Sequence, residues 1–267
     1  MTAAPAASAA ERIVQATTAA CRDDPDVRAA LTYGSIPQGL GDAHSDAEFW
    51  IFLAEAAYDR HDAGLWIARV CTPVLLCHNE FGADVAICAG LLRAEFHFHP
   101  VRAVDVVRDW PARGANVDAM VLVDHAAGLR AALRSVPERA VVPGDPGSID
   151  RPADIAARFA NWWVLGRNVL ERGENERAVD ALAHVRRHLL WLLRLRYDAT
   201  AHWLTPSRRA EVDLPAAELD KLRALSDTDL PAAYAAAWRI GARLWAEVAP
   251  PGPPAALVAE ATGTADP

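Results

Sequence analysis

The sequence predicts an α+β fold in which a sheet-containing amino-terminal domain is followed by a carboxy-terminal bundle of helices. From about residue 28 to residue 123, short runs rich in β-branched and aromatic residues alternate with helical stretches. A Pro/Gly cluster at residues 142–147 then interrupts this pattern. Beyond Pro152, apolar residues recur at helical spacing. The two halves therefore favour different secondary structure.

The strands expected in the first half are short and apolar. They are placed at residues 31–33, 47–53, 74–77, 85–88 and 91–99. The four cysteines of the chain, at positions 21, 71, 77 and 88, form no CxxC pair and lack the spacing of zinc ligands. We therefore interpret them as reduced thiols that pack as small hydrophobic groups.

The second half is expected to consist of helices. The spacing of apolar residues predicts helices at 152–173, 174–202, 215–225 and 231–248. The first two are predicted to be antiparallel, because Arg172-Gly173-Glu174 has the composition of a tight turn with glycine at the helix cap. The end of the chain is rich in Pro, Gly and Ala, which favours disorder. We thus expect one domain at residues 1–142, a helical bundle at 150–249 and a disordered tail at 250–267.

Size and charge narrow the function classes. A chain of 267 residues that is 52% hydrophobic can bury a full core and is expected to be globular. Its formal net charge of −8 provides no basic field for a nucleic-acid backbone, so we expect no nucleic-acid partner. The first ten residues lack the features of a secretory signal, and no stretch is long and apolar enough for a membrane span. The expected location is the cytoplasm, with no membrane partner.

The segment from residue 31 to residue 52 contains the candidate metal-binding and phosphate-binding residues. A strand leads into Gly34-Ser35, and a second strand opens with Asp46 and Glu48. Alternate residues of a strand share a face, so the two carboxylates point the same way. Their repulsion is relieved if a hard cation such as Mg²⁺ binds them; the alternative is a surface strand with solvated acids. Gly34 allows close approach of an anion, and Ser35 with its neighbouring N–H can hold a terminal phosphate.

This pattern, Gly34-Ser35 followed by Asp46-Ala47-Glu48, resembles the signature of the polymerase-β-like nucleotidyltransferase superfamily. Three further stretches narrow the resemblance to lincosamide nucleotidyltransferases with a carboxy-terminal helical bundle. These are Asn79-Glu80-Phe81-Gly82, Leu92 to Phe98, and Trp163-x-x-Gly166-x-Asn168-Val169-Leu170-x-Arg172-Gly173-Glu174. The resemblance covers roughly residues 30–195 and weakens in the last third.

The resemblance implies a mixed sheet and a homodimer with active sites near the subunit interface. It also implies that Asp46 and Glu48 bind Mg²⁺ and that Glu95 is the catalytic base. The reaction would attach a nucleoside monophosphate, AMP above all, from ATP or another nucleoside triphosphate to a hydroxyl of a lincosamide antibiotic, with release of pyrophosphate. The residues assigned to nucleotide binding are Tyr33, Gly34, Ser35, Gln38, Asp46 and Glu48. Gln38 stands where some relatives carry a basic residue, and Cys88-Ala89-Gly90 replaces a more polar loop.

The surroundings of Glu95 agree with a role as base. Strand alternation places Arg93, Glu95, His97 and His99 on one face and apolar residues on the other. A carboxylate between arginine and histidine can accept a proton. Three alternatives remain open: a zinc site of Glu95, His97 and His99, a purely structural His97, and Asp84 as third metal ligand or base in place of Glu95.

Other residues have both structural and functional interpretations. His97, Asn168 and Arg172 are candidates for binding the acceptor, although Asn168 and Arg172 can also simply cap or pair at a helix end. Trp162, Trp163, Trp191 and Trp203 favour a core role over substrate stacking. Motifs alone also allow an aminoglycoside nucleotidyltransferase, a protein-modifying enzyme, or a non-catalytic toxin–antitoxin component. The modified hydroxyl, the preferred base and the physiological role are not encoded in any motif.

Overall fold

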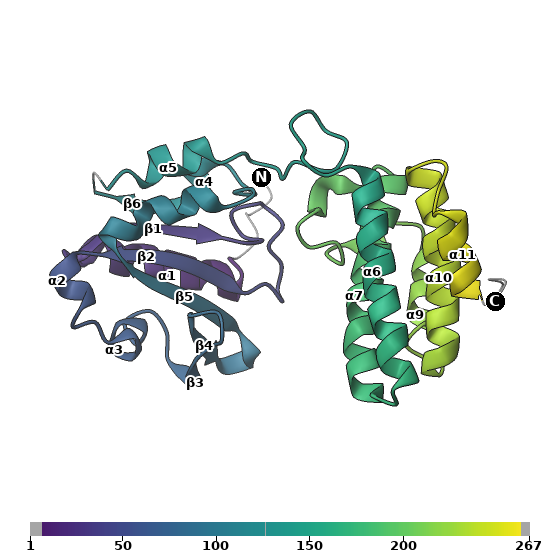
Figure 1. Ribbon diagram of the computed structural model, residues 1–267. Coiled ribbons are helices and arrows are strands. Elements are labelled where there is room, and N and C mark those ends of the chain that lie inside the picture. Colours follow the sequence, from purple (N-terminus) through teal and green to yellow (C-terminus); the bar gives the residue numbers. More distant parts are fainter. Residues whose placement is uncertain (1–6, 126, 263–267) are drawn as a thin grey trace, which may run out of the picture. The chain divides into compact units, whose positions relative to one another are not determined.

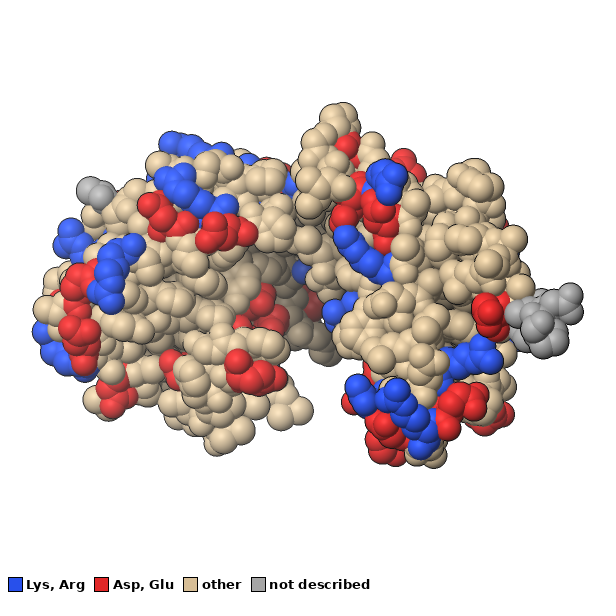
Figure 2. All heavy atoms as spheres, in the orientation of Figure 1, with Lys and Arg blue, Asp and Glu red and all other residues tan. Residues whose placement is uncertain are grey.

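The structure, a computed structural model, describes residues 7–125 and 127–262. The chain divides into two units, Met1–Ala140 and Val141–Pro267 (Figure 1). The first contains a mixed sheet with helices, and the second is helical, so the predicted α+β fold with a carboxy-terminal helical region is confirmed. On the face shown in Figure 2, acidic and basic side chains are interspersed over both units.

The first unit contains both strands and helices among its described residues. They are α1 (Ala9–Asp23), β1 (Val27–Tyr33), β2 (Ala47–Leu53), α2 (Glu55–Tyr58), α3 (Ala63–Ile67), β3 (Pro73–His78), β4 (Asp84–Cys88), η1 (Ala89–Leu91), β5 (Arg93–Pro100), η2 (Val101–Asp109), α4 (Val117–Met120), β6 (Val121–Asp124) and α5 (Leu129–Ser135). Helix α1 begins at a capping box, in which the Ser8 hydroxyl accepts a hydrogen bond from the Glu11 N–H and the Glu11 carboxylate accepts one from the Ser8 N–H.

Six strands form one sheet in the order β3-β4-β5-β2-β1-β6. The β2–β5 pair is parallel, and the other four pairs are antiparallel. One face of the sheet packs on α1 and α3 through Phe49, Ile51 and Phe96. The opposite face packs on η2 and α5 through Leu31 and Phe52. Both faces of the central strands are therefore covered, which explains their nearly continuous apolar sequence.

The edge strand β3 differs from the central strands. Val74, Leu75 and Leu76 are exposed although they are apolar. Cys77 on the same strand is exposed as well, whereas Cys21 is buried. The interpretation of the cysteines as packed hydrophobic groups is therefore confirmed for Cys21 and Cys88 and wrong for Cys77, because every residue of β3 after Pro73 is exposed.

The second unit contains seven helical elements among its described residues. They are α6 (Pro152–Glu171), α7 (Asn175–Arg196), η3 (Thr200–His202), α8 (Ala210–Asp213), α9 (Ala216–Ala224), α10 (Leu230–Val248) and α11 (Ala255–Thr262). The predicted turn between α6 and α7 is present, with Gly173 at a φ of +78° and its N–H bonded to the Leu170 carbonyl at 2.8 Å. Helix α7 ends at Arg196, earlier than predicted, because Asp198 adopts a φ of +50°.

Close helix packing holds this unit together. A Cβ atom at Gly166 would lie 2.0 Å from the Tyr234 hydroxyl, and one at Gly241 would lie 2.0 Å from Cζ of Phe159. These two glycines allow α10 to approach α6 closely. Trp163 is buried in the same core and donates its indole N–H to the Tyr234 carbonyl at 2.8 Å, so its predicted core role is confirmed.

A buried arginine fixes the segment that follows α7. Arg194 is 0% exposed and donates to the carbonyl oxygens of Ala199, Pro206 and Arg208 at 2.6, 2.8 and 2.6 Å. Its guanidinium also lies 3.3 Å from the Asp213 carboxylate. The burial of this charge is compensated because each side of the guanidinium has an acceptor.

The end of the chain differs from the expected disordered tail at 250–267. Helix α11 occupies residues 255–262, and its Leu257 and Val258 pack against the helical core. The apolar side chains thus offset the composition that favoured disorder. Residues 263–267 of the predicted tail lie outside the described residues.

Candidate active site

Three neighbouring strands position the candidate catalytic side chains. Tyr33 on β1 is paired with Glu48 on β2, and Glu48 is paired with Glu95 on β5. Residues directly opposite each other on paired strands project from the same face. Glu48 and Glu95 therefore share a face of the sheet, which alternation within either strand could not predict. The pairing brings together residues far apart in the sequence.

Arg93 links two of the three acids. One guanidinium nitrogen of Arg93 lies 2.7 Å from Oδ2 of Asp46, and the other makes a very short contact with Oε2 of Glu95. The remaining Glu95 oxygen is 2.9 Å from Nε2 of His97 and accepts a longer bond, of 3.4 Å, from the Tyr33 hydroxyl. Glu95 is thus held from three sides. Sequence reasoning placed Arg93 on this face but missed that it bridges Asp46 and Glu95.

These contacts, together with burial, determine the protonation states of Glu95 and Tyr33. Burial alone would raise the pKa of Glu95, but hydrogen bonds and charges from Arg93 and His97 bring it below its usual value. Burial, followed by the charges of Glu48 and Glu95, raises the pKa of the Tyr33 hydroxyl. Tyr33 is therefore a neutral hydrogen-bond donor and Glu95 an ionised acceptor at neutral pH.

Gly34 lies directly against Glu48. It has a φ of +79°, and a Cβ atom built on it would be 1.7 Å from Oε2 of Glu48. Only glycine satisfies both the left-handed backbone and this close approach. The following turn is closed by the Leu40 N–H, which donates to the Ser35 carbonyl at 3.0 Å. No residue that the structure describes makes a hydrogen bond with the Ser35 hydroxyl.

The other predicted nucleotide residue, Gln38, lies in the same loop. Its side-chain amide approaches Gly114 so closely that a Cβ atom there would be 2.7 Å from Nε2 of Gln38. Gly114 in turn donates its N–H to the Glu138 carbonyl at 2.9 Å. The loop that carries Ser35 and Gln38 is therefore supported by the chain segment around residues 113–115.

Asp84, the alternative base, projects from the other face of the sheet. It is paired directly with Phe96, whose side chain is buried beneath α1 and α3, whereas Glu95 belongs to the opposite face. Its carboxylate lies 3.1 Å from Nδ1 of His78. The sequence could not exclude Asp84, because its face depends on the register between β4 and β5.

His97 and His99 lie among aromatic rings. His97 is 8% exposed and stacks on Trp50 at 5.0 Å, and His99 stacks on the same ring at 4.5 Å. Within residues 7–125 and 127–262, no group of three or more His, Cys, Asp or Glu side chains is arranged to hold a metal ion by itself. The zinc alternative with Glu95, His97 and His99 therefore has no support in the geometry.

The two predicted acceptor contacts of the helical unit lie near one helix end. Asn168 belongs to α6, and Arg172 caps its carboxyl end. Both are exposed. Arg172 lies 4.0 Å from the carboxylate of Glu174, which also pairs with Arg177 at 3.0 Å. The predicted alternative, pairing at the surface, is thus present for Arg172.

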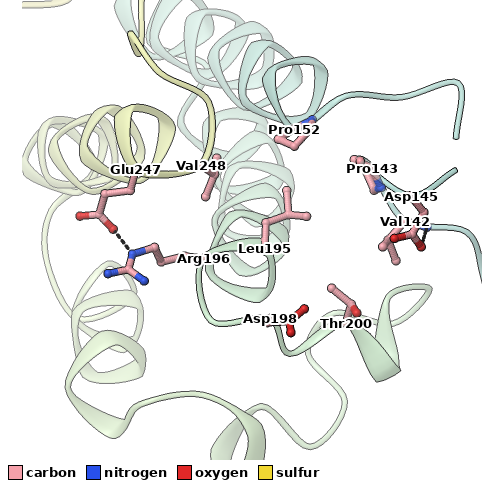
Figure 3. A pocket seen from close by; sticks show the side chains of 11 residues that line it. Val142, Pro143, Asp145, Pro152, Leu195, Arg196, Asp198, Thr200, Glu247 and Val248 are labelled. Atoms are coloured by element: carbon pink, nitrogen blue, oxygen red, sulfur yellow. Dashed lines mark hydrogen bonds and ion pairs between the residues drawn. The ribbon is translucent and has the colours of Figure 1, made fainter.

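The helical unit also contains a pocket of about 560 Å³ that the sequence did not single out (Figure 3). Leu195 and Val248 contribute apolar surface to it, and Asp198 and Thr200 contribute polar groups. The Arg196 guanidinium at its rim is paired with the Glu247 carboxylate at 2.8 Å. No local pattern marks these positions, because they come from several separate segments.

The match to a known protein family concerns this helical unit. Residues 150–251 match the family described as lincosamide nucleotidyltransferase-like, C-terminal domain. This match covers most of the carboxy-terminal unit and none of the amino-terminal unit. No curated protein matches the sequence. The lincosamide nucleotidyltransferase-like domain thus includes the segment of Asn168 and Arg172 that carried part of the sequence resemblance.

Two solved structures are similar to the chain at low identity. An aminoglycoside 6-adenyltransferase from Bacillus subtilis has 12% identity, with coverage of 97% of this chain and 92% of that chain and a TM-score of 0.34. A nucleotidyltransferase-like protein from Exiguobacterium sibiricum 255-15 has 15% identity, with coverage of 86% and 73% and a TM-score of 0.33. Among the described helices, none is long and apolar enough to cross a membrane.

Proposed function

We propose that this protein is a nucleotidyltransferase that moves a nucleoside monophosphate, AMP above all, from a Mg²⁺-bound triphosphate to a hydroxyl of a lincosamide. The observation that carries the proposal is the register of Glu48 beside Glu95, with Gly34 against Glu48 and Arg93 between Glu95 and Asp46. The family of the carboxy-terminal unit supports the choice of acceptor class.

The residues present fit a Mg²⁺ site. Mg²⁺ is usually held in proteins by one or two carboxylates together with substrate phosphates and water, so a complete protein cage is not required. Asp46 and Glu48 would hold the ion, and the absence of a Cβ atom at Gly34 allows the Glu48 carboxylate to lie directly against the loop that is assigned to the nucleotide. Bound there, Mg²⁺ supplies charge neutralisation for the triphosphate and for the departing pyrophosphate.

The side chains of this protein would bind the nucleotide and move one proton. Tyr33, Gly34, Ser35 and Gln38 are assigned to the nucleotide, with the Ser35 hydroxyl and its loop as donors to phosphate oxygens. The acceptor hydroxyl attacks the α-phosphorus, its proton passes to a Glu95 oxygen, and pyrophosphate leaves with the electron pair of the broken P–O bond. Glu95 is in the form that accepts a proton, because its pKa is lowered.

The remaining assignments concern the acceptor and the assembly. His97, Asn168 and Arg172 are proposed to contact the lincosamide. We further propose a homodimer, domains at residues 1–142 and 150–249, and a cytoplasmic location. The dimer proposal is tested by light scattering at micromolar concentration, where a monomer alone would contradict it.

An assay with three acceptors tests the proposed activity. The purified chain is incubated with labelled ATP and Mg²⁺ and with a lincosamide, an aminoglycoside, or cell lysate. We expect label transfer to the lincosamide and release of pyrophosphate. Transfer only to the aminoglycoside, or only to protein, would show that the acceptor is not a lincosamide. No transfer with any triphosphate would contradict the proposal that the protein is a nucleotidyltransferase.

Variants of the acids test the site itself. Asp46→Asn and Glu48→Gln should lower turnover by several orders of magnitude in a folded protein, because metal-assisted charge neutralisation dominates phosphoryl transfer. Glu95→Gln should lower kcat by about 10²- to 10⁴-fold with nucleotide affinity kept. Asp84→Asn is the matched control, since Asp84 lies on the other face. A larger kcat loss in Asp84→Asn than in Glu95→Gln would refute the assignment of the base.

A further inference from the structure

A second pocket of the helical unit, of about 240 Å³, contains residues that the proposed reaction does not use. It is bounded by the first half of α6, the second half of α7 and the segment after η3. Its lining consists of Asp150, Ile155, Arg158, His184, Arg187, His188, Trp191 and Trp203. We call this the Trp/Arg pocket. All its residues belong to one unit of the chain, so its geometry does not depend on the first unit.

Aromatic rings form one side of the Trp/Arg pocket, and they are fixed in place. The rings of Trp191 and Trp203 have centroids 6.0 Å apart. The indole N–H of Trp191 donates to the Trp203 carbonyl at 2.8 Å, which ties the loop to α7. His184 stacks on Trp162 at 3.9 Å with an angle of 9° between the rings. Both tryptophans that line the pocket are half-buried, so part of their surface remains available for a planar group.

Basic side chains lie next to these rings, on the same face of α7 as Trp191. His184, Arg187, His188 and Trp191 follow one another at helical spacing on α7 and therefore share its pocket face. The Arg158 guanidinium is bound at both ends by the Asp150 carboxylate, at 2.9 and 2.5 Å. In the part of the chain that the structure describes, Arg187 has no ion-pair partner. One positive charge is thus left over, in a protein whose formal net charge is −8.

The histidine at the base of the pocket responds to this charge. His188 is 6% exposed, and its Nδ1 lies 2.8 Å from the His184 carbonyl oxygen. Burial first, and then the positive charges of Arg158 and Arg187, lower the pKa of His188, whereas its hydrogen bond to the His184 carbonyl opposes this shift. A hydrogen bond from Nδ1–H leaves Nε2 as an acceptor in the neutral ring. The basic groups therefore act together on the interior of the pocket.

We propose that the Trp/Arg pocket binds an anionic ligand that carries a planar aromatic ring. The ring would stack on the tryptophan side, and the anionic group, a carboxylate or a phosphate, would bind Arg187. A neutral aromatic ligand would make no use of the Arg187 charge, and an anion without a ring would make no use of the tryptophan surfaces, so a ligand with both groups fits the pocket best. This site goes beyond the proposed function, because none of its residues belongs to the proposed nucleotide, metal or acceptor contacts.

Calorimetric titration of the full-length protein with four small probes tests the proposal. Benzoate and phenyl phosphate carry both features, benzamide is a neutral analogue of benzoate, and inorganic phosphate has no ring. We expect benzoate or phenyl phosphate to bind at millimolar concentration or below, and benzamide and inorganic phosphate to bind at least about 10-fold more weakly. Whichever aromatic anion binds more tightly identifies the anionic group.

Variants locate the binding. Arg187→Gln should weaken the preferred probe by about 10-fold or more, because a charge-assisted hydrogen bond is lost. Arg177→Gln, on the same helix outside the pocket, is the matched control and should leave affinity unchanged. Trp203→Ala should remove binding and Trp203→Phe should largely keep it, which separates loss of the ring from loss of folding.

Three results would overturn the proposal. The first is no binding of either aromatic anion. The second is equal affinity for the aromatic anion that binds more tightly and for its own control, which is benzamide for benzoate and inorganic phosphate for phenyl phosphate. The third is unchanged affinity in a folded Arg187→Gln protein. None of these outcomes bears on label transfer from ATP, so failure of this site and failure of the proposed enzyme remain distinguishable.

Discussion

Replacement of Gly34 by alanine tests the link between the loop after β1 and the Glu48 carboxylate, which we propose as a metal ligand. A Cβ atom at this position would lie 1.7 Å from Oε2 of Glu48, so the carboxylate must move. Gly39, five residues later in the same loop, provides the control. Its φ of +70° is close to the +79° of Gly34, but a Cβ atom there meets no described atom within 4 Å.

The two substitutions share the backbone cost and differ in the clash. A residue with a Cβ atom in the left-handed region costs about 1–2 kcal/mol, so both variants should lose similar stability. Only Gly34→Ala displaces Glu48. Because misplacement of a catalytic group by about 1 Å can cost roughly 10²-fold in rate, we expect at least this loss of kcat in Gly34→Ala. Gly39→Ala should stay within a few-fold of the parent protein.

Thermal unfolding and steady-state label transfer from ATP measure the two effects separately. Equal melting temperatures with a large difference in kcat would support the reasoning. If Gly34→Ala and Gly39→Ala had the same kcat, Glu48 would either tolerate displacement or have no part in turnover. A melting temperature much lower for Gly34→Ala alone would instead mean that the contact serves folding.

Three further predictions concern stability and reactivity. Arg194→Met should cost about 3–5 kcal/mol because it leaves buried acceptors unpaired, whereas half-exposed Arg196→Met should cost under about 1 kcal/mol; equal calorimetric transitions would contradict this. Burial raises the pKa of the Cys21 thiol to about 12, so a thiol reagent should label exposed Cys77 in the native protein and Cys21 only after unfolding, and simultaneous labelling would count against it. Folding lowers the pKa of Glu95, so the contribution of this group to stability is present above its unfolded pKa and is lost as the pH falls through its folded pKa. In urea titrations, Glu95→Gln should therefore lose less stability than the parent protein between neutral and acidic pH. An identical loss in both proteins would refute this reasoning.

Local sequence patterns were sufficient for the faces of individual strands. Alternation along β5 placed Arg93, Glu95 and His97 together, because the side-chain period of a strand is set by its own backbone. The same period predicted Asp46 and Glu48 on one face of a strand, but the observed strand β2 begins at Ala47 and therefore includes Glu48 only. The Gly173 turn was also predicted, because a glycine with positive φ ends a helix by a local mechanism.

Long-range pairing determined the parts that local patterns could not supply. The bridge from Arg93 to Asp46 requires β5 to lie parallel to β2, and the position of Asp84 requires the antiparallel register of β4 with β5. Exposure of the β3 edge likewise depends on strand order. The tail was misjudged because its apolar residues find partners in a core formed by distant helices.

The parallel pairing of β2 with β5 also determines when the site can form as the chain folds. Parallel neighbours cannot be joined by a tight turn, so the whole segment containing α2, α3, β3 and β4 must loop out before Glu95 meets Glu48. Contacts between distant segments form slowly, whereas the α6–α7 hairpin is local. A chain still emerging from the ribosome therefore carries Asp46 and Glu48 without Arg93, which later pairs with Asp46. The candidate active site is completed only once β5 is inserted beside β2.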